Sequence, residues 1–123
     1  MAKILIIDDD QMILGYFKRI QDKLKKEIVT ASDGMEGCQM AQDPDVKLIV
    51  MDFCIPGGLE KTSLLQKLKS LRPELPIIVI SGFSSKEIVE ECHKLGASEF
   101  LSKPFELSFL PTIIRRLLDT TPE

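Results

Sequence analysis

The sequence contains no long apolar run, no excess of positive charge and few cysteines. No segment approaches the roughly 20 apolar residues that a membrane-spanning helix needs. The apolar run Ile4–Ile7 is too short for the core of a secretory signal peptide, and three aspartates follow it. The net charge of −3 offers no basic surface for nucleic acid. The sequence therefore predicts a cytoplasmic protein without direct contacts to nucleic acid or membrane.

Cysteine and histidine are scarce, which argues against a site built from them. Cys38, Cys54 and Cys92 are widely spaced and show no paired metal-ligand pattern. We interpret them as reduced thiols, some of them in the core. The one histidine, His93, falls in a predicted amphipathic helix and is expected at the surface.

The chain also lacks any internal repeat, low-complexity segment or linker that would divide it into parts. Its 123 residues suffice for one domain that buries about two-thirds of the surface of the unfolded chain. We therefore predict a single domain over residues 1–123, with no output domain.

Strand and helix patterns alternate along the whole chain, which is typical of a parallel sheet in an α/β protein. Short apolar or alternating runs predict five strands, at Lys3–Ile7, Glu27–Ala31, Val46–Met51, Ile77–Ile80 and Glu99–Ser102. Helical spacing predicts five helices. The first carries apolar residues from Met12 to Leu24 with Asp10 as N-cap, and the second runs from Gly34 to about Gln42, weakened by Gly37. The third has Leu64, Leu65, Leu68 and Leu71 on one face and stops before Pro73, the fourth runs from Ser85 to Leu95 and is closed by Gly96, and the fifth starts at Ser108 with Pro111 in its first turn.

Acidic side chains follow two of the predicted buried strands. Asp8, Asp9 and Asp10 come directly after the first strand, and Asp52 comes directly after the third. The carboxyl ends of parallel strands line the ligand crevice of an open α/β sheet, so these carboxylates are expected to lie together. Such a cluster is costly unless a cation or a proton compensates its charge.

The fourth and fifth strands end at the same edge, in Ser81-Gly82 and Lys103-Pro104. Carboxylate oxygens of Asp8, Asp9 and Asp52, with waters and a backbone carbonyl, suit Mg²⁺. The serine hydroxyl and the lysine ammonium can bind phosphoryl oxygens, and phosphoryl transfer depends mostly on such positioning and charge stabilisation. An aspartate can itself be the nucleophile and form an aspartyl phosphate.

Four motifs in this order resemble the receiver domain of two-component response regulators. They are Ile6–Asp10, Val50–Gly57, Ile80–Gly82 and Gly96–Phe105, and the resemblance covers residues 2–118. It implies a doubly wound five-stranded sheet of flavodoxin-like order 2-1-3-4-5, with helices on both faces. It also implies phosphorylation by a histidine kinase or histidine phosphotransfer protein, with Mg²⁺, or Mn²⁺ in its place, as cofactor. No enzymatic activity is expected beyond Mg²⁺-dependent self-phosphorylation and self-dephosphorylation.

The resemblance also implies a role for each matching residue. The phosphoacceptor corresponds to Asp52, the metal-binding pair to Asp8 and Asp9, the backbone carbonyl ligand to Cys54, the phosphoryl-binding hydroxyl and lysine to Ser81 and Lys103, and the aromatic switch position to Phe100. Asp10 has no metal role in this pattern and is interpreted as a helix cap. Three positions depart from the pattern: Glu60 where glycine is frequent, Gly37 where alanine is common, and Phe100, which lacks a tyrosine hydroxyl.

Two other functions fit parts of the pattern. A haloacid-dehalogenase-like phosphatase uses an aspartate, a serine or threonine and a lysine, but it needs a further acidic motif after the lysine and would leave Asp52 without a role. A flavodoxin-like nucleotide binder needs a first loop that cradles phosphate, which three carboxylates would repel. Within the receiver hypothesis, a stand-alone regulator, a phosphorelay intermediate and a module of a hybrid sensor kinase or larger regulator stay open, and the downstream protein is unknown.

Overall fold

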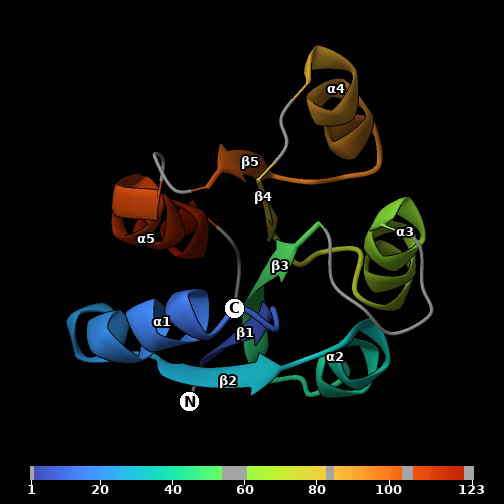
Figure 1. The fold of residues 1–123 in the computed structure, drawn as a ribbon. Coiled ribbons are helices and arrows are strands. Elements are labelled where there is room, and N and C mark those ends of the chain that lie inside the picture. The colour runs from blue at the N-terminus through green and yellow to red at the C-terminus, as the bar shows by residue number, and fades with distance from the viewer. Residues whose placement is uncertain (1, 54–60, 83–84, 104–106, 121–123) are drawn as a thin grey trace.

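Five parallel strands form one sheet in the order β2-β1-β3-β4-β5, in a computed structural model that describes residues 2–53, 61–82, 85–103 and 107–120 (Figure 1). The strands are β1 (Lys3–Ile7), β2 (Glu27–Ala31), β3 (Val46–Asp52), β4 (Ile77–Ser81) and β5 (Glu99–Ser102). The helices are α1 (Gln11–Leu24), α2 (Gly34–Met40), α3 (Lys61–Leu71), α4 (Lys86–Lys94) and α5 (Leu110–Thr120), the last preceded by the 3-10 turn η1 (Leu107–Phe109). The predicted fold class and strand order are confirmed.

Helices cover both faces of the sheet, and each face has its own hydrophobic cluster. Helices α1 and α5 lie on one face, and α2, α3 and α4 lie on the other (Figure 1). Alternate residues of β1 serve the two clusters, because successive side chains of a strand point to opposite faces. Ile4 and Ile6 pack with α1 and α5, whereas Leu5 and Ile7 pack with the other three helices. The central strands are therefore apolar over most of their length, as buried parallel strands are.

Most helix ends have the predicted chemistry. Asp10 caps α1 by accepting a hydrogen bond from the Met12 N–H (2.9 Å). Gly96 follows α4 with a φ of +105°, a conformation that glycine adopts without the steric cost paid by other residues. Pro111 lies in the first turn of α5, where its missing N–H removes no helical hydrogen bond. These local signals were sufficient to place the helices.

Four predictions need correction. Helix α5 begins at Leu110, two residues later than the predicted Ser108, because Leu107–Phe109 form the 3-10 turn η1. Strands β3 and β4 each extend one residue further than predicted, so Asp52 and Ser81 are the last residues of their strands rather than the first of a loop. Helix α2 ends at Met40, two residues earlier than predicted. Met12 was grouped with the apolar face of α1, but it is 80% exposed. Position 12 is next to the N-terminus of the helix, and the core face begins at Ile13.

Gly37 has a packing role that its helix propensity does not reveal. The residue is buried in α2, and a Cβ atom there would lie 2.6 Å from Cδ1 of Ile7. Real Cβ contacts are not that short, so any side chain would push α2 or Ile7 aside. The glycine predicted to weaken α2 is what lets this helix lie close to β1.

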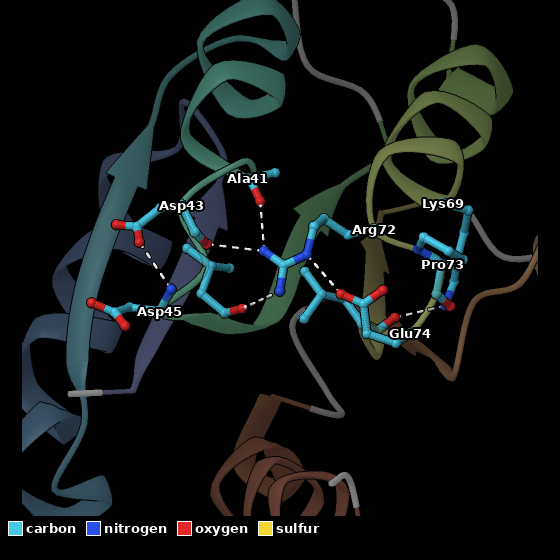
Figure 2. Close-up of polar contacts among 9 residues, drawn as sticks. Ala41, Asp43, Asp45, Lys69, Arg72, Pro73 and Glu74 are labelled. Carbon is cyan, nitrogen blue, oxygen red and sulfur yellow. Dashed lines mark hydrogen bonds and ion pairs between the residues drawn. The ribbon is translucent and has the colours of Figure 1, made fainter. Parts of the chain in front are cut away.

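The amino edge of the sheet is held by Arg72, which follows α3 (Figure 2). Its Nη1 donates to the carbonyls of Ala41 and Asp43 (both 2.9 Å), and its Nη2 donates to the Val46 carbonyl (3.2 Å). Its Nε pairs with Glu74 Oε1 at 2.7 Å. One guanidinium thus ties the end of α3 to the loop that joins α2 and β3.

Surface and core positions of the remaining sequence features agree with prediction where they are described. Cys38 and Cys92 are free and buried, and His93 is exposed. Cys54 and Glu60 lie outside the described residues. None of the helices in the described part of the chain has the length and apolar character needed to cross a lipid bilayer.

Candidate functional site

The sheet register brings the predicted site residues to one edge. In the pairing of β1 with β3, Ile7 lies opposite Met51. Asp8 and Asp52 are therefore the next residues after this pair, on two neighbouring strands. Ser81 ends β4 opposite Ser102 of β5, and Lys103 follows directly. The Lys103 N–H donates to the Ser81 carbonyl at 2.9 Å, which ties the ends of β4 and β5 together. Residues nearly 100 positions apart in sequence therefore share one site.

Three carboxylates form the centre of this site. One oxygen from each of Asp8, Asp9 and Asp52 lies within 4.8 Å of the others. Asp8 and Asp52 are buried, with relative exposures of 1% and 6%, whereas Asp9 is exposed. Asp8 Oδ1 accepts a hydrogen bond from the Asp10 N–H (2.8 Å), but its buried Oδ2 has no hydrogen-bond donor among the described residues. A buried acceptor without a donor is costly and marks a place where a ligand can bind.

The pKa of Asp8 reflects this environment. Burial, supported by the negative charge of Asp52, raises the pKa of the Asp8 carboxyl from 3.8 to about 6. The hydrogen bond from the Asp10 N–H and the positive charge of Lys103 oppose the shift without cancelling it. Ionisation of Asp8 therefore costs more free energy in the folded protein than in the unfolded chain, and a divalent cation would relieve the repulsion. Three clustered carboxylates are the hard oxygen donors that Mg²⁺ prefers, so the residues present fit this ion.

Lys103 is the cation of the site. Its Nζ lies 3.1 Å from Asp52 Oδ2, 3.5 Å from Asp8 Oδ2 and 3.7 Å from Asp10 Oδ2. Burial by itself lowers the pKa of the ammonium, but the hydrogen bond to Asp52 and the three negative charges outweigh it and raise that pKa. Lys103 therefore carries a full positive charge at neutral pH, directly beside the Asp52 carboxylate.

The remaining predicted residues lie beside this centre. Ser81 is buried at the end of β4. Phe100 lies half-buried in β5, packed against the hydrophobic cluster that α2, α3 and α4 share. The backbone carbonyl expected from Cys54 lies outside the described residues.

One contact of the site was missed in the sequence. Asp10 was interpreted as a cap alone, but its second carboxylate oxygen also faces Lys103. The run of three aspartates could have indicated this contact, because Asp10 follows Asp8 and Asp9 at the carboxyl edge of the sheet. Its pairing with a residue 93 positions later depends on how α1 packs relative to β5, which no local pattern encodes.

Comparison with known proteins identifies the family. The model of the response regulator receiver domain matches residues 4–115 of the chain. The chain belongs to this family. A receiver domain protein of the CheY-like type from Methanospirillum hungatei JF-1 has a solved structure that superposes with a TM-score of 0.86, at 31% identity over 97% of this chain and 94% of that one.

Curated relatives include both short and long proteins. Sporulation initiation phosphotransferase F of Bacillus subtilis is 22% identical over 116 residues, which cover 94% of this chain and 93% of that protein. The DNA-binding transcriptional regulator NtrC of Azospirillum brasilense is 31% identical over 97% of this chain. The chain spans 24% of that regulator and 3% of hybrid signal transduction histidine kinase G of Dictyostelium discoideum, which is 31% identical over 118 residues.

Family membership establishes the class of function. Receiver domains are signalling domains of two-component systems, phosphorylated on aspartate by histidine kinases or phosphotransfer proteins, and they generally bind Mg²⁺ at an acidic cluster. The phosphatase and nucleotide-binding alternatives lose their support, because the receiver-domain model matches residues 4–115.

Proposed function

We propose that the receiver domain formed by residues 1–123 accepts a phosphoryl group on Asp52 from a histidine kinase or a histidine phosphotransfer protein. The observation that carries this proposal is the position of Asp52 at the end of β3, hydrogen-bonded to Lys103 Nζ at 3.1 Å and grouped with the Asp8 and Asp9 carboxylates. A nucleophile beside a fixed ammonium and a cation site is the arrangement that phosphoryl transfer needs.

Asp8, Asp9 and Asp52 would hold Mg²⁺, or Mn²⁺ in its place, with the Cys54 backbone carbonyl as a further ligand. Support comes from the three clustered carboxylate oxygens and from the buried Asp8 Oδ2 that has no hydrogen-bond donor among the residues described. When bound, the ion supplies positive charge beside Asp52 and the phosphoryl oxygens.

The transfer itself uses the Asp52 carboxylate. An oxygen of Asp52 attacks phosphorus as the bond from phosphorus to the donor histidine nitrogen breaks, and that nitrogen keeps the electron pair. Lys103, held protonated by the surrounding carboxylates, changes partner from the Asp52 carboxylate to a phosphoryl oxygen. Its ammonium thereby stabilises charge that increases during the reaction.

The switch would involve Ser81 and Phe100. The Ser81 hydroxyl would move to bind another phosphoryl oxygen. This movement of Ser81 would be transmitted to the end of β5, because the Lys103 N–H donates a hydrogen bond to the Ser81 carbonyl. Phe100, two residues before Ser102, would then change its packing against the α2, α3 and α4 cluster. The absence of a hydroxyl on Phe100 makes this a change of packing alone.

The proposal applies equally to a stand-alone regulator and to a receiver module of a hybrid sensor kinase or larger regulator, because the chemistry is contained in the domain. The expected cytoplasmic location stays a prediction from the sequence.

The test is phosphorylation by acetyl phosphate with excess MgCl₂, followed by intact mass. The parent should gain one phosphoryl group, and Asp52→Asn should gain none. Asp33→Asn, which alters the N-cap of α2 on the same edge of the sheet, is the matched control and should react like the parent. Equal phosphorylation of Asp52→Asn and the parent would overturn the proposal.

A further inference from the structure

Asp10 joins two parts of the site that the sheet does not connect. One carboxylate oxygen, Oδ1, accepts the Met12 N–H and caps α1. The other, Oδ2, lies 3.7 Å from Lys103 Nζ, after β5. The Asp10 side chain is 39% exposed, so it contacts solvent as well as the ammonium. A single residue thus links the first turn of α1 with the cation of the site.

The three carboxylates around Lys103 differ in what phosphorylation would do to them. Asp52 would become esterified and Asp8 would bind the metal, so both would lose part of their hold on Lys103. Asp10 belongs to neither group, because the clustered metal-binding oxygens come from Asp8, Asp9 and Asp52. Its attraction for the ammonium therefore persists throughout the reaction and opposes the transfer of Lys103 to the phosphoryl group.

We propose that Asp10 is a positioning residue that restrains Lys103 and thereby limits phosphorylation of Asp52. The inference rests on the proposed function. The Asp10 charge acts in two ways that agree in sign: it competes with the phosphoryl oxygens for Lys103, and it repels an anionic phosphodonor. The same charge favours cation binding, so Asp10 raises the affinity for Mg²⁺ while it slows the transfer.

Capping and charge can be separated by substitution. Asp10→Asn keeps an oxygen that accepts the Met12 N–H, but it carries no charge. Asp10→Ser also caps without charge and serves as a second variant should the asparagine disturb α1. Asp33→Asn removes one N-cap charge from the same edge of the sheet, from a residue whose carboxylate accepts the Glu36 N–H at 2.8 Å. It reports the effect of one charge without the contact to Lys103.

The first measurement is the rate of phosphorylation by acetyl phosphate at saturating Mg²⁺ and low salt. Asp10→Asn and Asp10→Ser should react about threefold faster than the parent, a size typical of a partly exposed charge pair. Asp33→Asn should match the parent. The gain should shrink in about 1 M salt, because screening weakens an exposed charge but leaves a helix cap unaffected. A rate equal to or below that of the parent in both Asp10 variants overturns the inference.

The second measurement needs no phosphodonor. Apparent Mg²⁺ affinity, from the shift of the thermal midpoint with increasing MgCl₂, should fall about twofold to threefold in Asp10→Asn. Unchanged affinity in both Asp10 variants counts against a charge effect of Asp10 on the site. The Asp10→Asn, Asp52→Asn double variant distinguishes the two failures: phosphorylation of this double variant sinks the proposed function, whereas an unreactive double variant with no rate gain in the single variants sinks the role of Asp10 alone.

Discussion

At the amino edge of the sheet, the Arg72 guanidinium donates to three backbone carbonyls and pairs with Glu74, whereas at the carboxyl edge the Lys103 ammonium faces three carboxylates. The acceptors around Arg72 are backbone carbonyls of the loop that joins α2 and β3 and of the first residue of β3. Around Lys103, by contrast, the buried Asp8 Oδ2 has no hydrogen-bond donor in the part of the chain that the structure describes. One edge of the sheet thus carries a guanidinium with four hydrogen-bond acceptors, and the other carries a buried carboxylate oxygen without a donor among the described residues.

The difference separates stability from function. A matched charge such as Arg72 stabilises the fold, because removing it leaves buried carbonyls without a donor. A mismatched cluster costs stability in the metal-free domain, and this cost is relieved when a ligand supplies the missing charge. The amino edge should therefore respond to mutation by losing stability, and the carboxyl edge by gaining it.

The largest effect is expected at the amino edge. Arg72→Ala should lower the free energy of unfolding by about 3 kcal/mol, because three carbonyls lose their donor and water reaches only part of the space left behind. Urea denaturation measures this loss. The control is Arg116→Ala, which breaks an exposed pair with Glu99 (2.6 Å) and should cost less than about 0.5 kcal/mol. If both variants lost the same free energy of unfolding, Arg72 would stabilise the amino edge no more than an exposed ion pair does.

The opposite sign is expected at the carboxyl edge. Asp8→Asn should raise the free energy of unfolding of the metal-free domain by about 2 kcal/mol at about pH 7.5, because ionised Asp8 is disfavoured in the folded state. The variant keeps an oxygen that can accept the Asp10 N–H. Excess MgCl₂ should stabilise the parent and leave the variant nearly unchanged, which removes most of this gap. A variant less stable than the parent without metal would contradict the comparison between the two edges.

The pH dependence of this gap follows from the pKa of Asp8, raised from 3.8 to about 6 in the folded protein. Below the unfolded value both states bind the proton, and Asp8 costs nothing. As the pH rises from about 4 to about 6, the unfolded state releases its proton first, so the parent loses stability. Above that range the loss is constant. The gap between Asp8→Asn and the parent should therefore open between about pH 4 and 6. A gap that does not change with pH would show that it does not come from ionisation of the Asp8 carboxyl.

The smallest effect tests whether the amino edge depends on Arg72 or on ion pairs in general. Asp43→Asn removes the charge partner of Lys3, which lies 2.8 Å away in a partly exposed pair. Asparagine can still accept the Asp45 N–H, the other hydrogen bond of this side chain. Solvent screens such pairs, so the thermal midpoint should stay within about 2 °C of the parent. A larger fall in the thermal midpoint would show that the Lys3–Asp43 pair also stabilises the amino edge.

The sequence alone was enough for the fold and for most of the proposed site. Period-two and period-3.6 patterns placed all five strands and five helices within two residues at nearly every end. They could do so because buried side chains recur every second residue in a strand and about every 3.6 residues in a helix. Asp8, Asp9, Asp52, Ser81 and Lys103 were found because each lies at the end of a strand, and parallel strands end at one edge of the sheet. These features depend on local periodicity and on topology.

Other features depend on distances between elements that no local pattern contains. Glycine at position 37 reads as a weak point of a helix until α2 is packed on Ile7. Met12 fits the apolar spacing of α1, yet the packing of that helix leaves it exposed. Arg72 finds its carbonyl partners and Asp10 finds Lys103 only after helices and strands have been brought together. The spacing of residues in the sequence determined which side chains reach each edge of the sheet. Tertiary packing decided which of these side chains find hydrogen-bond partners, as Arg72 does, and which stay without one among the described residues, as the buried oxygen of Asp8 does.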